Sequence, residues 1–187
     1  MTQWRAGSLP GVNEPVPQWA TEPITIVDPD PSWPAQAAEL RKQLVGLLDH
    51  WLTTDIHHVG STAVPELPAK PILDLMAGAA DLDQATAIAA VLAAHGWHYL
   101  PPELDQRPSR RFFVHVVGGR RHAHLHLMRP STADWQRHLD FRDRLLADPA
   151  LRAEYAALKR QLAATHADDR EAYTEAKSAF ITRATAQ

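Results

Sequence analysis

The chain has 187 residues, of which 45% are hydrophobic and 22% are charged, enough for one domain with a real core. Its formal net charge of -3 disfavours nucleic-acid binding over the whole surface, and the lack of cysteine excludes disulfides and thiolate metal sites. No long apolar run or signal-peptide pattern is present, which predicts a cytoplasmic protein without a membrane span.

The predicted elements start after an irregular arm at residues 1–22, which is rich in proline and glycine. A single domain is expected over residues 23–187. It opens with a β-rich run at residues 24–27, predicted to be a short strand, and continues with a helix that Ser32 caps.

Two further strands are predicted on either side of a Gly60-Ser61 pair. The first covers residues 56–60, and the second covers residues 71–78. A helix with one apolar side then begins after the N-cap Asp81, and Gly96 ends it.

The next segment predicts a strand at residues 97–100 and then a β-hairpin, with strands at residues 110–117 and 120–128. Its turn is Gly118-Gly119, which supplies the positive φ angles that tight turns need. After Pro130 the hydrophobic period becomes helical and predicts three helices within residues 132–184. The fold class is therefore α/β (α+β), with a mixed sheet of four or five strands, two helices packed on it and a C-terminal helical segment.

Side-chain alternation predicts two chemically different faces for the hairpin. A two-residue turn at Gly118-Gly119 would place His115 opposite His122. The polar face is then expected to hold Arg111, Phe113, His115, His122, His124 and His126. The apolar face is expected to hold Phe112, Val114, Val116, Ala123, Leu125 and Leu127. On the strand at residues 71–78, Asp74 lies on the same side as Ile72 and Met76.

Asp74, His124 and His126 form a candidate site for a divalent cation. Histidines at i and i+2 of a strand point the same way, and borderline metals accept mixed nitrogen and oxygen ligands. The alternative is a solvated sheet face that carries neutral histidines. Five histidines outside the hairpin are interpreted as ordinary polar residues: His57, His95, His98, His138 and His166.

The Gly60-Ser61-Thr62 segment is a candidate phosphate-binding turn, because glycine permits close backbone approach and the next two residues expose amide and hydroxyl donors. Lys70 is a candidate phosphate contact, with a solvated loop lysine as the alternative. Arg111 is a candidate for neutralising phosphate charge, because guanidinium binds phosphate oxygens bidentately. A charged edge that prevents strand aggregation is the alternative for the arginines of the hairpin.

The chain resembles the GrpB family over about residues 23–184, in the strings HHVGSTAVPELPAKPILDLM, RRFFVH, RRHAHLHL, HLDFRDRLLADP, YAALKRQLA and DDREAYTEAKSAFI. The resemblance implies a nucleotidyltransferase-like fold, which in some bacteria is appended to dephospho-CoA kinase. The family's motif residues would fall here at His58, Gly60, Ser61, Thr62, Pro65, Lys70, Pro71, Asp74, the arginine at 110 or 111, His124, His126, Arg142 and Lys177. Glu66 departs from the family, which usually has glycine there.

Met76 is a second departure. Active nucleotidyltransferases usually carry Asp-x-Asp/Glu, because two carboxylates bridge two metals, and a thioether is a poor ligand for Mg²⁺. Either His124 and His126 replace the missing carboxylate, which would favour Mn²⁺ or Zn²⁺ over Mg²⁺, or the two-metal chemistry is lost.

Two functions are therefore expected from the sequence. The first is a metal-dependent nucleotidyltransferase that acts on a nucleoside triphosphate and a small acceptor. Its catalytic residues would be Asp74 and Arg111, its metal ligands Asp74, His124 and His126, and its nucleotide contacts His58, Gly60, Ser61, Thr62 and Lys70. The second is a non-catalytic nucleotide- or metabolite-binding module that assists a protein partner such as dephospho-CoA kinase. A hydrolase that uses a metal-bound water is a further possibility.

Overall fold

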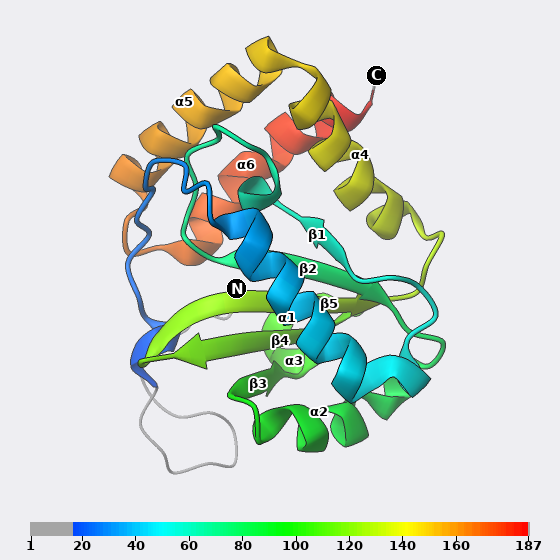
Figure 1. The fold of residues 1–187 in the computed structure, drawn as a ribbon. Helices are drawn as coiled ribbons and strands as arrows, with labels where there is room; N and C mark the ends of the chain where they lie inside the picture. The colour runs from blue at the N-terminus through cyan, green and yellow to red at the C-terminus, as the bar shows by residue number, and fades with distance from the viewer. Residues whose placement is uncertain (1–16, 187) are drawn as a thin grey trace.

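The computed structural model describes residues 17–186, and most of the predicted N-terminal arm lies outside them. A five-stranded mixed sheet has the strand order β1-β2-β5-β4-β3 (Figure 1). Its strands are β1 (His57–Val59), β2 (Leu73–Gly78), β3 (Trp97–Leu100), β4 (Arg110–Val117) and β5 (Arg120–Met128). β2 and β5 are parallel, and the other neighbours are antiparallel.

Six α-helices accompany the sheet among the described residues: α1 (Trp33–Leu48), α2 (Ala85–Ala93), α3 (Pro102–Asp105), α4 (Ala133–Ala147), α5 (Pro149–Thr165) and α6 (Arg170–Thr185). Four short 3₁₀ turns are η1 (Gln18–Ala20), η2 (Asp49–Trp51), η3 (Ser61–Ala63) and η4 (Leu82–Gln84). None of the helices described is long and apolar enough to cross a membrane. The α/β class and the C-terminal helical segment predicted from the sequence are confirmed.

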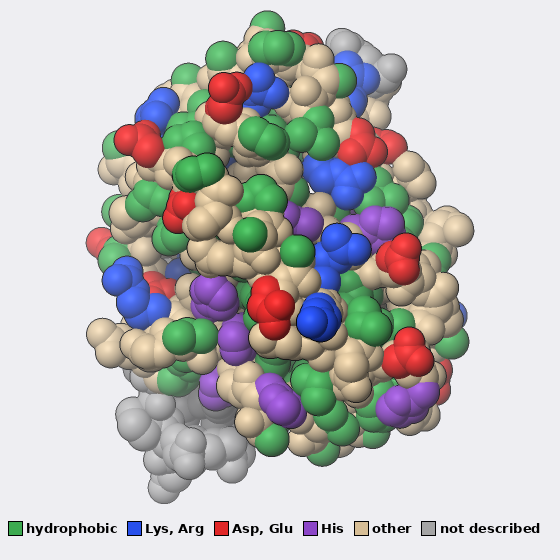
Figure 2. Space-filling model, viewed as in Figure 1, with side chains coloured by type: hydrophobic (Ala, Val, Ile, Leu, Met, Phe, Trp, Pro, Cys, Tyr) green, Lys and Arg blue, Asp and Glu red, His purple; other side chains and the backbone are tan. Residues whose placement is uncertain are grey.

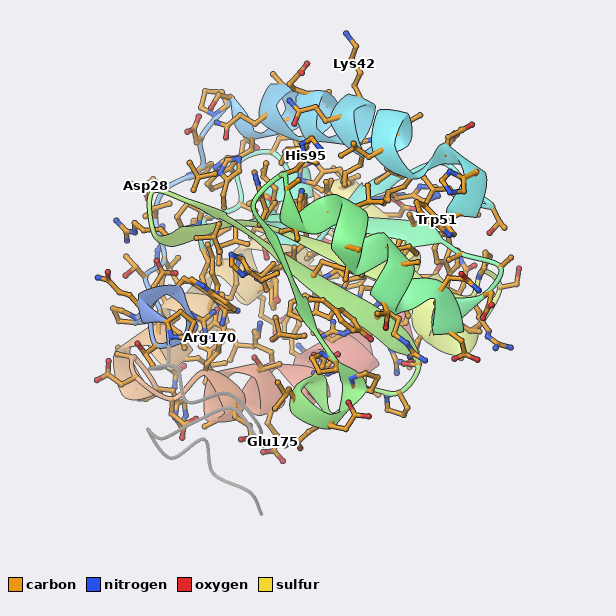
Figure 3. The ribbon with its side chains drawn as sticks, turned by 90° about the horizontal axis from the view of Figure 1, so that it is seen from below. Asp28, Lys42, Trp51, His95, Arg170 and Glu175 are labelled. Carbon is orange, nitrogen blue, oxygen red and sulfur yellow. The ribbon has the colours of Figure 1, made fainter. Side chains whose placement is uncertain are left out.

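The helices lie on two sides of the sheet. α1, which carries Lys42, lies on one side, and α6, which carries Arg170 and Glu175, lies on the other (Figure 3). The main core joins α1 and α2 to the sheet, and a second cluster joins α4, α5 and α6 to the loop after β1. Asp74 and the Gly60 turn therefore lie where the sheet meets the C-terminal helices.

Local sequence explains where these helices start. The side chains of Thr132, Asp148 and Asp169 each accept a hydrogen bond from a backbone N–H in the first turn of α4, α5 or α6. Asp81 accepts from the Asp83 N–H before α2, as predicted. Such caps satisfy donors that have no partner within the helix. Ser32 precedes α1, but its side chain makes no capping bond.

The strand predicted at residues 24–27 is wrong. Val27 makes only an isolated bridge with Ala69. Ile24 instead donates its N–H to the Ala167 carbonyl and is buried beside Leu162 and Tyr173 of the C-terminal helices. A β-rich run without a sheet edge beside it has no ladder to join, so tertiary packing decides its structure.

The hairpin turn is confirmed, but the predicted register is wrong. Gly118 and Gly119 both have positive φ and form the turn. A β-bulge then pairs His115 with Ala123 and leaves His122 as the extra residue. A one-residue shift moves a strand's side chains to the opposite face of the sheet.

The shift exchanges the predicted faces of β4, whereas those of β5 from residue 123 onward are as predicted. The face that carries Asp74 also holds Arg110, Phe112, Val114, His124 and His126. The opposite, apolar face holds Arg111, Phe113, His115, Ala123, Leu125 and Leu127. Arg111, Phe113 and His115 were predicted on the histidine face, and Phe112 and Val114 on the apolar one.

Candidate functional site

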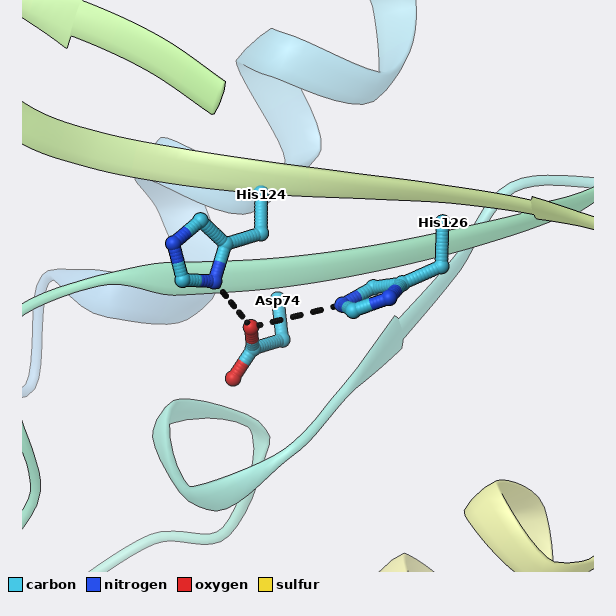
Figure 4. A group of neighbouring side chains, drawn as sticks. All are labelled: Asp74, His124 and His126. Carbon is cyan, nitrogen blue, oxygen red and sulfur yellow. Dashed lines mark hydrogen bonds and ion pairs between the residues drawn. The ribbon is translucent and has the colours of Figure 1, made fainter. Parts of the chain in front are cut away.

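Asp74 lies on β2 between β1 and β5, with Val59 and His124 as its partners across the ladders. His124 Nδ1 lies 2.9 Å from Asp74 Oδ1, and His126 Nε2 lies 3.6 Å from the same oxygen (Figure 4). The three side chains offer ligand atoms that all lie within 4.8 Å of one another. The sequence-predicted trio is therefore brought together in space.

The charges in this trio follow from its contacts. Burial acts to raise the pKa of Asp74, but hydrogen bonds from His124 and His126 hold that pKa well below its usual range. Burial lowers the pKa of His124, and burial followed by repulsion from Arg110 lowers the pKa of His126 to about 3. At neutral pH the trio is a carboxylate with two neutral imidazoles. Asp74 keeps 32% of its side chain exposed, so a ligand can reach it.

Gly60 closes directly over this carboxylate. Its backbone has φ 70° and ψ -169°, a conformation that is essentially reserved for glycine. A Cβ atom at this position would lie 2.4 Å from Asp74 Oδ2 and 2.9 Å from Asp74 Cβ. The sequence therefore needs glycine here for two reasons, the backbone conformation and the close approach to Asp74.

Ser61, Thr62 and His58 have different places around the turn. The Ser61 side chain lies beside the hydroxyl of Tyr155 from α5 and interacts with it. Thr62 is buried and donates to the Ile72 carbonyl, while His58 Nε2 lies 3.0 Å from Thr62 Oγ1. His58 projects to the sheet face opposite Asp74. His58 and Thr62 therefore support the turn from the side away from the carboxylate.

The predicted position of Arg111 beside the histidines is wrong. Its Nε donates to the Leu82 carbonyl at 3.1 Å, and its Nη1 donates to the Pro108 carbonyl at 3.2 Å. Arg110 takes the predicted place on the Asp74 face, with Nη1 2.7 Å from His126 Nδ1. The sequence offered both arginines, and the bulge decides between them.

Three lysines lie within electrostatic reach of one another and are here called the lysine cluster: Lys70, Lys159 and Lys177. Two of them, Lys70 and Lys177, also interact with Asp74. The Nζ atoms of Lys70 and Lys177 lie 4.8 and 4.5 Å from the centre of the Tyr173 ring. Lys159 is 2% exposed and donates to the Pro68 carbonyl. Of the three, Lys70 was predicted as a site residue, Lys177 came from the family motif alone, and Lys159 was not predicted.

The environment of the lysine cluster disfavours its own positive charge. Burial lowers the pKa of Lys70 and Lys159 to about 7, and repulsion from Lys177 adds to this for both. Burial lowers the pKa of Lys177 to about 8, although Asp74 acts in the opposite direction. Within residues 17–186 none of the three forms a salt bridge with a carboxylate.

Met76 occupies the position where a second carboxylate would stand. It is fully buried and packs with Val59, Met128 and Trp135. The thioether is therefore part of a small apolar core. The position that would carry a second acid is therefore used for core packing. Asp74 is the one carboxylate of the site among the described residues.

His138, which was interpreted as an ordinary polar residue, adjoins the site. Its ring centre lies 5.8 Å from that of His126, and its Nδ1 lies 2.9 Å from the Asp134 carbonyl oxygen. Burial lowers its pKa to about 4. No pattern in the sequence of α4 distinguishes His138 from an ordinary polar residue, because its contact with His126 arises only in the folded chain.

Comparison with known proteins shows where the chain belongs among sequences. The family model described as GrpB protein matches residues 23–187. The UPF0157 protein YqkA of Bacillus subtilis is 36% identical over 67% of this chain, but the match spans only 36% of that relative's length. A dephospho-CoA kinase of Mycolicibacterium paratuberculosis is 31% identical over 88% of this chain and 46% of its own length.

Solved structures give a matching picture. The crystal structure of conserved protein GrpB from Enterococcus faecalis covers 87% of this chain and 95% of its own, with 29% identity and a TM-score of 0.77. A fainter likeness, with a TM-score of 0.39 and 16% identity over 72% of this chain and 44% of the other, is to Cid1 in complex with the UTP analog UMPNPP. A likeness that faint says nothing about activity.

Proposed function

The chain belongs to the GrpB family, and from that premise we propose that the region around Asp74 binds the phosphate groups of a nucleotide, together with one divalent cation. The ligand class is a nucleoside triphosphate or a similar small phosphorylated metabolite. The lysine cluster is the observation that carries the proposal.

Three ammonium groups that share one partly buried region repel one another and lose hydration, which destabilises the folded protein unless an anion compensates. The protein supplies no carboxylate partner for them within residues 17–186, and Asp74 is the acidic group whose charge reaches Lys70 and Lys177. A phosphate chain would offset this charge with several oxygens at once. The face of the molecule drawn in Figure 2 mixes acidic and basic side chains.

A divalent cation fits the described residues at Asp74. Its Oδ1 faces both imidazoles, while its Oδ2 lies against the Gly60 backbone and has no hydrogen-bond partner among residues 17–186. A free, ionised carboxylate oxygen is the donor that Mg²⁺ and Mn²⁺ prefer, with phosphate oxygens and water as the usual further ligands. When bound, the cation would neutralise phosphate charge and orient the phosphates.

Nucleotidyl transfer to a small acceptor is the second candidate function. It is favoured by the ionised state of Asp74 and by the phosphate-type turn beside it, and Ser61, Lys70 and Lys177 would hold the phosphates. The burial of Met76 counts against the two-metal form of that chemistry. The dephospho-CoA kinase relative is about twice as long as the region that matches this chain. A binding module that assists a protein partner is therefore a further form of the proposal.

The two candidates are separated by ligand binding and turnover measured in turn. Thermal shifts with nucleoside triphosphates and Mg²⁺, Mn²⁺ or Zn²⁺ are expected to show a rise for at least one pair. Asp74→Asn should abolish the cation-dependent part of that rise, because the amide oxygen carries no charge, while the exposed control Asp55→Asn should retain it. Pyrophosphate release that depends on Asp74 would establish transfer; binding without release would leave the module. If no nucleotide shifts the melting temperature, the proposal fails.

The ligand-free protein is expected to become more stable between roughly pH 7 and pH 9.5, by about 1 to 3 kcal/mol. The folded lysine cluster has pKa values of about 7 to 8, below the ordinary value for lysine. Over this window the unfolded chain binds more protons than the folded one, so stability rises with pH. Urea unfolding at a series of pH values measures this. Saturating pyrophosphate should flatten the curve, and a flat curve without ligand would contradict the assigned charges.

A further inference from the structure

Arg110 is a firmly held cation on the Asp74 face. Its Nε and Nη2 donate to the two carboxylate oxygens of Asp105 at 2.7 and 2.6 Å, and the two side chains are only 11% and 8% exposed. The guanidinium also lies 4.3 Å from the centre of the Phe112 ring. A bidentate, largely buried pair of this kind fixes the direction of the remaining nitrogen.

That remaining nitrogen, Nη1, lies 2.7 Å from His126 Nδ1. A guanidinium offers only donors, so Nδ1 must present its lone pair to Arg110. The hydrogen of the neutral imidazole is then on Nε2, and Nε2 faces Asp74 Oδ1 at 3.6 Å. His126 is 6% exposed, and its ring centre lies 5.1 Å from that of Phe112, so the ring has little room to turn.

This arrangement is opposite to the one that a metal-binding histidine requires. A histidine ligand presents a lone pair to the metal and donates its other N–H to an acceptor such as a carboxylate or carbonyl. At His126 the outer partner is Arg110, which cannot accept. Coordination through Nε2 would therefore move the hydrogen to Nδ1, where it would point at another donor.

We infer that Arg110 is a positioning residue that holds His126 in the Nε2–H tautomer, with this N–H directed at Asp74 and no lone pair offered to a cation. His124, whose Nδ1 lies on the same Asp74 oxygen, acts as the second donor. Together they orient the carboxylate so that Oδ2 is directed to the Gly60 turn. The site then offers a hard oxygen donor, which selects Mg²⁺ or Mn²⁺ over Zn²⁺.

The tautomer is read directly by two-bond ¹H–¹⁵N correlation spectra of the histidine rings in the ligand-free protein, with His126→Gln identifying the signals. This measurement is independent of nucleotide binding, so it stands or falls separately from the proposed function. The expected result at neutral pH is a protonated Nε2 and an unprotonated Nδ1 for His126. A protonated Nδ1, or a doubly protonated ring, would overturn the inference.

A matched pair of variants tests the role of Arg110 itself. Arg110→Lys keeps a donor-only side chain and should retain the tautomer, whereas Arg110→Gln provides an amide oxygen that can accept from Nδ1–H. In Arg110→Gln we expect the Nδ1–H form to appear and Zn²⁺ affinity to rise about 10-fold over Arg110→Lys. Equal spectra and equal Zn²⁺ affinity in both variants would refute positioning by Arg110. Zn²⁺ coordination by His126 in the unmodified protein would do so as well, even if neither variant folds.

Discussion

Gly60→Ala is expected to lower the free energy of unfolding by about 2 to 4 kcal/mol and to abolish ligand binding at Asp74. The new methyl group would lie 2.4 Å from Asp74 Oδ2 and 2.9 Å from Asp74 Cβ, far inside van der Waals contact. The backbone, with φ 70° and ψ -169°, is also strained for any residue with a Cβ. Relief requires the turn to move away from the carboxylate, which separates the two halves of the proposed site.

The matched control for this change is Gly46→Ala. Gly46 lies inside α1, and a Cβ added there would meet no atom within 4 Å beyond its chain neighbours and the backbone of its own helix. Alanine should stabilise the helix by roughly 0.5 to 1 kcal/mol and leave ligand binding unchanged. Urea unfolding monitored by circular dichroism gives both values. A Gly60→Ala protein as stable as the parent would show that the turn does not press on Asp74.

Lys177→Met is expected to have opposite effects on stability and binding. Without ligand it should raise the free energy of unfolding by about 0.5 to 2 kcal/mol, because it removes a charge that burial disfavours and keeps the contact with the Tyr173 ring. It should also weaken nucleotide binding roughly 10- to 100-fold, because a charge-assisted contact to phosphate is lost.

This combination separates a binding site from a scaffold. A structural lysine would give a loss of stability when it is replaced, whereas a ligand-holding lysine costs stability that only the ligand recovers. Lys42→Met is the control, since Lys42 lies on α1 and points to solvent on the far side of the sheet (Figure 3). Parallel unfolding and titration experiments give the two numbers for each variant. Unchanged nucleotide affinity in Lys177→Met would remove that lysine from the site.

Much of the fold can be predicted from the sequence because the residues that specify each element lie within or next to it. The Gly118-Gly119 turn, the Asp81 cap and the helical periods after Pro130 each specify an element through nearby residues. The strand prediction at residues 24–27 was wrong because a strand needs a partner edge, and the local pattern contains no information about such an edge.

The candidate site was predicted in part. Asp74, His124 and His126 come together because alternation on two adjacent parallel strands is a reliable geometric rule. The choice of Arg111 over Arg110 failed at the bulge, where a single unpaired residue reverses the faces of β4. No residue pattern in the hairpin marks that bulge.

The lysine cluster shows a different limit of sequence analysis. Lys70 follows β1 by a loop, while Lys159 and Lys177 come from α5 and α6, and only tertiary packing brings them together. Each alone has the pattern of a solvated lysine. Their significance lies in shared burial without a carboxylate partner, a property of the folded chain that no single segment carries.

Calorimetric titration of the full chain with ATP and Mg²⁺ at neutral pH tests the central claim most directly. Saturable binding to one site is expected in the parent protein, with Asp74→Asn losing the dependence on Mg²⁺ and Lys177→Met losing affinity even without Mg²⁺. Absence of binding for ATP and for inorganic pyrophosphate, or binding that neither substitution alters, would contradict a phosphate site at Asp74 and the lysine cluster.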